Sequence, residues 1–200
     1  RSIGYVLQEG GLFPHRSIAD NIATVPRLEG TTKQASRERA LELLNLVGLD
    51  REMADRYPAQ LSGGQRQRVG VARALANRAD ILLMDEPFGA LDPIVRAELQ
   101  CELKEIQRAL GTTILFVTHD VDEAFTLGDQ VAILSTGGHI EQVGTPSELL
   151  SSPASPFVAE FVGASRAARP VHLAGSGGLI VDEAGTPVGT LTSDKARDRP

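Results

Sequence analysis

Short continuous runs of apolar residues recur along the chain and predict strands. The runs cover residues 81–84, 114–117 and 131–134, and residues 3–7 have a similar character. Such runs, each ending in polar residues or a turn, are typical of strands that are buried on both faces of a parallel sheet. The pattern therefore predicts an α/β fold.

Two segments have the apolar spacing of helices. In residues 36–48 the apolar side chains recur at i, i+3, i+4 and i+7, and Gly48 is placed to end the helix. A longer helix is predicted after Asp92 and Pro93, which suit the N-cap and the first turn, and it extends to Gly111. One apolar stripe runs along it: Val95, Leu99, Leu103, Ile106 and Leu110.

The longer helix lies between two predicted strands, and this order indicates a βαβ unit. Asp85 and Glu86 follow the first strand directly, and His119 follows the second. Ligands of open α/β sheets bind at the carboxyl ends of the strands. We therefore expect Asp85, Glu86 and His119 to lie at one functional edge.

Composition narrows the class of protein. The 200 residues are 42% hydrophobic and 23% charged, which is enough to bury a core. The net charge of −6 argues against a broad nucleic-acid surface. The one cysteine, Cys101, excludes an intrachain disulfide, and no apolar run approaches the roughly 18–20 residues that cross a bilayer. With no signal peptide at Arg1, we expect a soluble intracellular protein.

The composition changes after Gly163. Residues 1–163 contain the predicted α/β elements, and residues 164–178 are rich in small residues and indicate a linker. The apolar runs 179–181 and 188–191 flank a turn and predict a hairpin. A hairpin alone is marginally stable, so residues 179–200 are interpreted as a fragment of a second module.

The segment from Leu61 to Gln65 has the pattern of an anion site at a helix start. Ser62 and Gln65 have the spacing of a capping box, and Gly63 and Gly64 leave the backbone N–H groups uncovered. The alternative is an ordinary capped helix after a glycine turn.

Four further residues could carry chemistry at strand ends. Asp85 could hold Mg²⁺ where the ion meets phosphate oxygens, and Glu86 could orient an attacking water. The alternative is that both acids cap the following turn. His119 could bond a γ-phosphate or be structural, and Gln8 could contact a metal ion or water or be an ordinary loop residue.

In chain order these features resemble the ATP-binding subunit of an ABC transporter. Gln8 matches the Q-loop, residues 61–65 the signature motif, Asp85 and Glu86 the Walker B motif, Asp92 the D-loop and His119 the H-loop. The resemblance covers residues 1–163. It implies a P-loop NTPase-like ABC ATPase core, truncated at its N-terminus, with a helical subdomain at about residues 9–80 and a short C-terminal extension.

Three segments resemble, in their detailed sequence, the ATPases of importers of osmoprotectants such as glycine betaine, choline or carnitine. These segments are residues 11–15, 21–26 and 87–94. The resemblance implies ATP and Mg²⁺ as cofactors, a second ATPase subunit, integral membrane permease subunits and, indirectly, a substrate-binding protein, with no nucleic acid. It places the protein peripherally at the cytoplasmic face of the plasma membrane.

The resemblance also assigns roles to individual residues. Glu86 would be the catalytic carboxylate, and His119 would contact the γ-phosphate. Asp85 and Gln8 would serve Mg²⁺ and the attacking water. The residues that would bind the nucleotide of the opposite subunit or lie at the interface between subunits are Ser62, Gly63, Gly64, Gln65 and Asp92. Residues 8–27 would touch the membrane subunits.

The chain departs from the family in its lysines. A P-loop needs Gly-x-x-x-x-Gly-Lys-Ser/Thr, but Lys33, Lys104 and Lys195 neither follow glycine nor precede Ser or Thr. In the family this loop lies upstream of the Q-loop. We therefore expect that these 200 residues begin inside the domain, bind ATP weakly or not at all, and leave part of their sheet uncovered.

Three alternatives remain open from the residues. The chain could belong to a soluble ABC ATPase of DNA repair or translation, or it could be a truncated, non-catalytic remnant, so its status as an enzyme is not decided. Residues 179–192 are similar to the strand-turn-strand of a CBS domain, which would imply regulation, although any apolar hairpin would look alike.

Overall fold

The computed structural model describes residues 3–163, 171–174, 179–182 and 187–190. Two compact units divide between Glu123 and Ala124, and each is described by itself. The first unit holds the predicted βαβ arrangement. In chain order its elements are β1 (Ile3–Val6), η1 (Gln8–Gly11), α1 (Ile18–Ile22), α2 (Thr24–Leu28), α3 (Lys33–Leu46), η2 (Arg51–Asp55), η3 (Pro58–Gln60), α4 (Gly63–Leu75), β2 (Ile81–Asp85), α5 (Pro93–Leu110) and β3 (Thr113–Val117).

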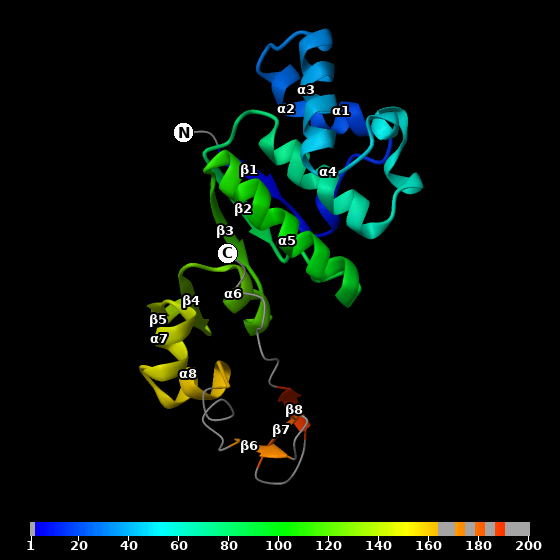
Figure 1. Ribbon diagram of the computed structural model, residues 1–200. Helices are drawn as coiled ribbons and strands as arrows, with labels where there is room; N and C mark the ends of the chain where they lie inside the picture. Colours follow the sequence, from blue (N-terminus) through cyan, green and yellow to red (C-terminus); the bar gives the residue numbers. More distant parts are fainter. Residues whose placement is uncertain (1–2, 164–170, 175–178, 183–186, 191–200) are drawn as a thin grey trace, which may run out of the picture. The chain divides into compact units, whose positions relative to one another are not determined.

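A parallel three-stranded sheet with the order β1-β2-β3 forms the centre of the first unit (Figure 1). The register aligns Val6 with Met84 and Met84 with Phe116. The crossover from β2 to β3 passes through α5, as the sequence predicts. The carboxyl ends of the three strands therefore lie at the same edge.

One face of this sheet is covered by α4 and α5. Val6, Leu82 and Met84 on this face are fully or almost fully buried. Val71 of α4, Met84 of β2 and Leu103 of α5 line the same small apolar cavity, so the three elements pack together. Figure 1 shows α1, α2 and α3 gathered on the far side of α4.

The opposite face of the sheet is exposed, contrary to the expectation of strands buried on both faces. Ile3 and Leu115, at 62% each, are the most exposed apolar side chains of β1 and β3. The exposure agrees with the expected uncovered part of the sheet. Its immediate physical cause is that α4 and α5 both pack on the other side.

Helix α3 begins earlier than the apolar spacing predicts. The Thr32 side chain accepts a hydrogen bond from the Ala35 N–H at 3.3 Å, and this cap starts the helix at Lys33 instead of Ser36. The predicted end is confirmed, because Gly48 has the left-handed φ of +67° that stops a helix. Helix α5 ends in the same way at Gly111, with φ +64°.

The second unit contains the third predicted strand in a different setting. Here β4 (Val131–Ser135) pairs antiparallel with β5 (His139–Gly144), so the prediction of a parallel strand buried on both faces is wrong for this structure. Only Ile133 of β4 is buried. A short continuous apolar run does not distinguish a strand buried on both faces from one that is buried at a single position, as β4 is.

The rest of the second unit consists of helices followed by an antiparallel sheet. Helix α6 (Val121–Leu127) crosses the boundary between the units, and α7 (Pro146–Ser151) and α8 (Pro156–Phe161) follow β5. A separate sheet then forms with the order β6 (Val171–Ala174), β7 (Leu179–Asp182) and β8 (Pro187–Thr190).

This last sheet contains the predicted hairpin and one additional strand. Strands β7 and β8 pair antiparallel, and β6 arises from within the predicted linker. Residues 164–170 and 175–178 of that linker, and residues 183–186 and 191–200 of the interpreted fragment, lie outside the described residues. In the part of the chain that is described, no helix is long and apolar enough to span a membrane.

Candidate functional site

Glu86 stands at the carboxyl end of β2 in an unusual backbone conformation. Its φ is +41°, a region that residues other than glycine seldom adopt. Its N–H donates to the Val117 carbonyl at 2.9 Å, which ties the residue to the end of β3. Because such strained positions cluster at functional sites, this geometry marks Glu86 as a candidate for chemistry.

His119 meets Glu86 across the ends of the two strands. The His119 Nδ1 and Glu86 Oε1 atoms lie 3.0 Å apart, although the residues are 33 positions apart in the chain. The hydrogen bond to Glu86, reinforced by its negative charge, raises the pKa of His119 above the ordinary value. The imidazole is 76% exposed, so its other nitrogen is accessible to a ligand.

Gln8 lies beside the same carboxylate. A Cβ placed on Gly89 would come within 3.3 Å of Glu86 Oε2 and 3.7 Å of Gln8 Nε2, so both side chains lie against this glycine. The Gly89 N–H also donates to the Glu86 carbonyl at 3.2 Å. The structure therefore brings Gln8, Glu86 and His119 together at the predicted edge.

Asp85 is the last residue of β2 and its side chain is exposed at the same edge. The carboxylate of Asp85 and the amide oxygen of Gln8 are hard oxygen donors of the kind that Mg²⁺ accepts. Within the described ranges no group of three or more His, Cys, Asp or Glu residues could hold a metal ion by itself. Because Mg²⁺ usually binds one or two carboxylates and completes its shell with phosphate oxygens and water, the chemistry of these donors suits this ion, and their joint binding of it remains a prediction.

The segment from Ser62 to Gln65 forms the predicted capping box. The Gln65 N–H donates to Ser62 Oγ at 3.2 Å, and the Ser62 N–H donates to Gln65 Oε1 at 2.9 Å. Ser62 is exposed, and its own hydroxyl hydrogen can still be donated. The first N–H groups of α4 have no acceptor within the helix, so this end can receive an anion.

Gly63 and Gly64 pack against the start of α5. A Cβ on Gly64 would lie 2.7 Å from Cγ1 of Val95, and one on Gly63 would lie 3.5 Å from Cδ2 of Leu91. A larger residue at position 64 would have to displace the Val95 side chain, so packing favours glycine there. The role of this segment in binding a nucleotide remains a prediction.

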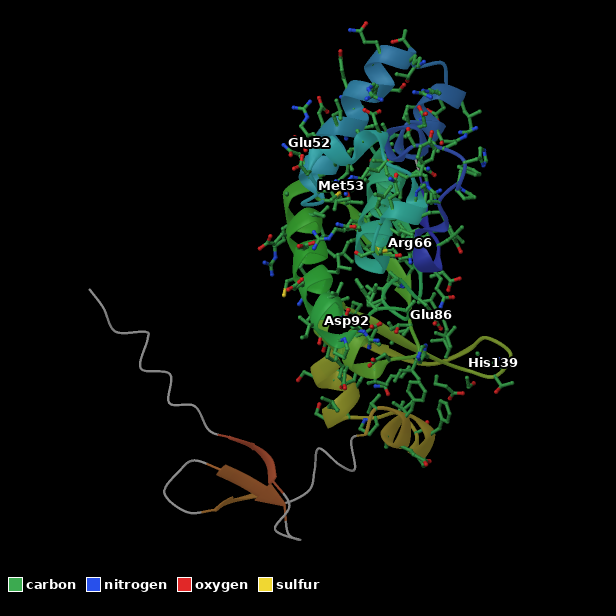
Figure 2. All side chains as sticks on the ribbon, turned by 90° about the vertical axis from the view of Figure 1, so that its right-hand side faces the viewer. Glu52, Met53, Arg66, Glu86, Asp92 and His139 are labelled. Atoms are coloured by element: carbon green, nitrogen blue, oxygen red, sulfur yellow. The ribbon has the colours of Figure 1, made fainter. Side chains whose placement is uncertain are left out.

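Asp92 has the structural role that its position predicts. Its Oδ1 accepts hydrogen bonds from the Ile94 and Val95 N–H groups, each at 3.1 Å, and so caps α5. Figure 2 shows Asp92 and Glu86 in the same part of the first unit, well away from Glu52 and Met53 of η2. The placement of Asp92 at an interface between subunits is still a prediction.

Sequence reasoning missed Arg73, which fixes the loop that carries Gln8. Its Nη1 and Nη2 donate to the carbonyls of Gly11 and Gly10, each at 2.8 Å, and burial lowers the pKa of the guanidinium. The close approach of Gly70 to Gly10 reinforces this contact, because a Cβ on Gly70 would lie 2.8 Å from Gly10 Cα. The Gly10-Gly11 pair signals a turn in the sequence, but it does not indicate that Arg73 binds there.

Comparisons with known proteins identify relatives of this chain. The family model described as "ABC transporter" matches residues 1–89. The glycine betaine/carnitine/choline transport ATP-binding protein of Bacillus subtilis is 57% identical over 166 residues, which is 83% of this chain and 43% of that protein. A glycine betaine uptake system ATP-binding protein of Escherichia coli is 52% identical over 165 residues, covering 82% of this chain and 53% of that protein.

A solved structure is similar as well. It is a dimeric, post-hydrolysis state of the ATP-binding cassette MJ0796 bound to ADP and Pi, with a TM-score of 0.62 and 35% identity. The similarity covers 72% of this chain and 62% of that one. The fold and the edge of the sheet thus define a domain of the ATP-binding cassette class. The chain is thus a homologue of ABC transporter ATP-binding proteins, and it spans about half the length, or less, of the curated relatives described above.

Proposed function

We propose that this chain supplies the hydrolytic edge of the ATP-binding subunit of an ABC importer for quaternary-amine osmoprotectants. The observation that carries the proposal is the Glu86–His119 pair, 3.0 Å apart at the ends of adjacent parallel strands. Relatives named for glycine betaine, carnitine and choline transport support the substrate class.

In the proposed reaction Glu86 orients the attacking water and accepts its proton. His119, held by Glu86 through Nδ1, presents Nε2 to the γ-phosphate, where an N–H donor stabilises the charge that develops on the transferring group. Asp85 and Gln8 would hold Mg²⁺, which supplies charge neutralisation at the phosphates. The 200 residues contain no Gly-Lys-Ser/Thr sequence, so the phosphate-cradling lysine is not part of this assignment.

We assign the Ser62–Gln65 segment to the ATP held by a second copy of the subunit. Ser62 is exposed at a helix start that can receive an anion, while no lysine adjoins it in the sequence. An anion-binding helix start without an adjacent lysine suits a site whose remaining phosphate ligands come from a second copy of the subunit. The dimeric state of the solved relative supports the pairing of two copies.

The membrane partner would dock in a groove of about 500 Å³ on the helical part of the first unit. Phe13, Arg16 and Leu28 line it, together with the ion pair between Arg27 and Asp20, whose Nη1 and Oδ1 atoms are 2.8 Å apart. An exposed apolar patch beside charged groups suits a loop of a permease subunit. This contact would hold the ATPase peripherally at the cytoplasmic face of the plasma membrane.

The experiment is uptake by the full-length gene product, co-expressed with its permease subunits and reconstituted in vesicles. We expect ATP-dependent uptake of labelled glycine betaine, choline or carnitine, and its loss with Glu86→Gln while ATP binding is retained. Uptake that survives Glu86→Gln would contradict the catalytic assignment. Hydrolysis without any co-purifying membrane subunit would favour a soluble ABC ATPase, and lack of ATP binding by the gene product would favour a non-catalytic remnant.

A further inference from the structure

Arg96, in the first turns of α5, contacts three residues in two segments of the first unit. Its Nη2 donates to the Leu91 carbonyl at 3.3 Å, directly before the helix cap Asp92. Its Nη1 lies 3.3 Å from Asp120 Oδ2, and its Nε lies 3.6 Å from Glu123 Oε1. The side chain therefore joins the loop before α5 to the segment that follows β3.

The two acids that pair with Arg96 both follow His119 and hydrogen-bond within the same loop. Asp120 accepts through Oδ1 from the N–H groups of Asp122 and Glu123, at 2.9 and 3.3 Å. Glu123 is 5% exposed and accepts from Thr118 Oγ1 at 2.7 Å. A buried carboxylate needs a positive partner, and the Arg96 guanidinium is a cation within 4 Å of both Asp120 and Glu123, with an ion pair but no hydrogen bond from its Nε to Glu123.

Leu91, the residue at the other end of the Arg96 hydrogen bond, lies near the start of α4 at Ser62. Leu91, whose carbonyl Arg96 holds, packs beside Gly63, and Val95 packs against Gly64. Leu91 and the first turn of α5 therefore contact the Ser62–Gln65 segment directly and the segment after His119 through Arg96. In close-packed interiors, a displacement of one neighbour is transmitted to the next.

We propose that Arg96 is a positioning residue that couples the His119 loop to the Ser62–Gln65 segment. This inference rests on the proposed function, in which His119 acts on the ATP of its own subunit and Ser62 on that of the second copy. Arg96 contacts neither nucleotide. It fixes the loop that carries His119 and ties it to Leu91, whose side chain packs beside Gly63.

The test compares Arg96→Ala and Arg96→Lys with Arg108→Ala in the full-length gene product. Arg108 is an exposed arginine near the end of the same helix and serves as a matched control for loss of charge. Lysine keeps a positive charge beside Glu123, so this variant is expected to fold, but its single ammonium cannot hold the Leu91 carbonyl and Asp120 Oδ2 in a fixed fork.

We expect kcat for ATP to fall on the order of 10- to 100-fold with Arg96→Ala and by a smaller factor with Arg96→Lys, while KM for ATP stays within about twofold. Arg108→Ala should leave both values unchanged. A merely structural role predicts loss of folded protein with a normal kcat per folded molecule. Wild-type kcat in both Arg96 variants, or a rise in KM alone, would overturn the proposal.

Hydrogen exchange separates failure of this inference from failure of the proposed function. If the wild-type gene product does not turn over ATP, the proposed function fails, but the contact is still tested. Arg96→Lys should speed exchange at the Asp120 and Glu123 amides and leave the β1–β2 pairing unchanged. Unchanged exchange in the Thr118–Glu123 segment would overturn the coupling role, whatever the turnover.

Discussion

The two faces of the β1–β3 sheet carry similarly apolar side chains but have opposite exposures. Leu82 and Met84 are at most 2% exposed beneath α4 and α5, whereas Leu115 and Val117 on the other face are more than 60% exposed. The alternation of side chains along a strand assigns each residue to one face, and the packing of the helices then decides which face is buried. Hydrophobicity alone does not reveal this difference.

The carboxyl ends of the same strands differ from both faces of the sheet, because they carry partly exposed polar side chains that are candidates for chemistry. The side chains of Glu86 and His119 are 34% and 76% exposed. Substitutions there should change chemistry with little effect on packing, whereas substitutions on the buried face should do the reverse. Four predictions test this contrast.

The largest effect is expected for Glu86→Gln in the full-length gene product. Removal of a general base lowers turnover by about 10²- to 10⁴-fold, while the midpoint of urea unfolding should change little, because glutamine has nearly the same shape and keeps the same φ. ATP turnover and urea unfolding of the same preparation check this. A large loss of stability with normal turnover per folded molecule would mean that Glu86 belongs to the scaffold.

Leu82→Ala and Leu115→Ala compare the two faces directly. We expect Leu82→Ala to lower the free energy of unfolding by about 2–5 kcal/mol, because a fully buried leucine leaves a cavity. Leu115→Ala, at a site that is 62% exposed, should cost less than about 1 kcal/mol. Equal losses in urea titrations would show that both faces are covered in solution.

Gly70→Ala tests the contact that holds the Gln8 loop on α4. A Cβ here would lie 2.8 Å from Gly10 Cα, so the backbones must separate, and we expect a loss of about 1–3 kcal/mol. Gly30→Ala is a useful comparison, because a Cβ on Gly30 meets no atom within 4 Å and only its φ of +89° is strained. If Gly70→Ala were as stable as the wild type in urea, the close contact would be wrong.

The smallest effect concerns the ionisation of His119. Glu86 raises the pKa of this imidazole, so the pair stabilises the folded state most fully below the ordinary pKa near 6.5 and loses this contribution as pH rises through the raised value. In an NMR titration, Glu86→Gln should bring the pKa of His119 down toward 6.5, and Asp122→Asn should have a much smaller effect. If the pKa of His119 in Glu86→Gln stayed at the wild-type value, the pairing would be contradicted.

Local signals in the sequence predicted the elements that depend on neighbouring residues. The capping box of Ser62 and Gln65, the cap at Asp92 and the stop at Gly111 all require residues within a few positions of one another. The common edge for Asp85, Glu86 and His119 also followed, because parallel strands joined by a helix place their carboxyl ends together.

Long-range contacts could not be predicted from these signals. The partners of Arg73 are 62 and 63 positions away, and those of Arg96 lie up to 27 positions along the chain. The run at residues 131–134 misled the prediction because a short apolar strand has the same pattern in a parallel sheet and in a hairpin. The roles of the site residues in ATP chemistry remain predictions.

The central claim is that each ATP site combines Glu86 of one copy with Ser62 of another, and turnover by mixed dimers of the full-length gene product tests it most directly. Pairing a Glu86→Gln copy with a Ser62→Ala copy leaves one intact composite site, whereas pairing a doubly substituted copy with a wild-type copy leaves none. The account predicts ATP turnover by the first mixed dimer and its loss in the second, when each is purified free of dimers of identical copies. Turnover by the second mixed dimer and loss in the first would contradict it, because each copy would then act with its own Glu86 and Ser62.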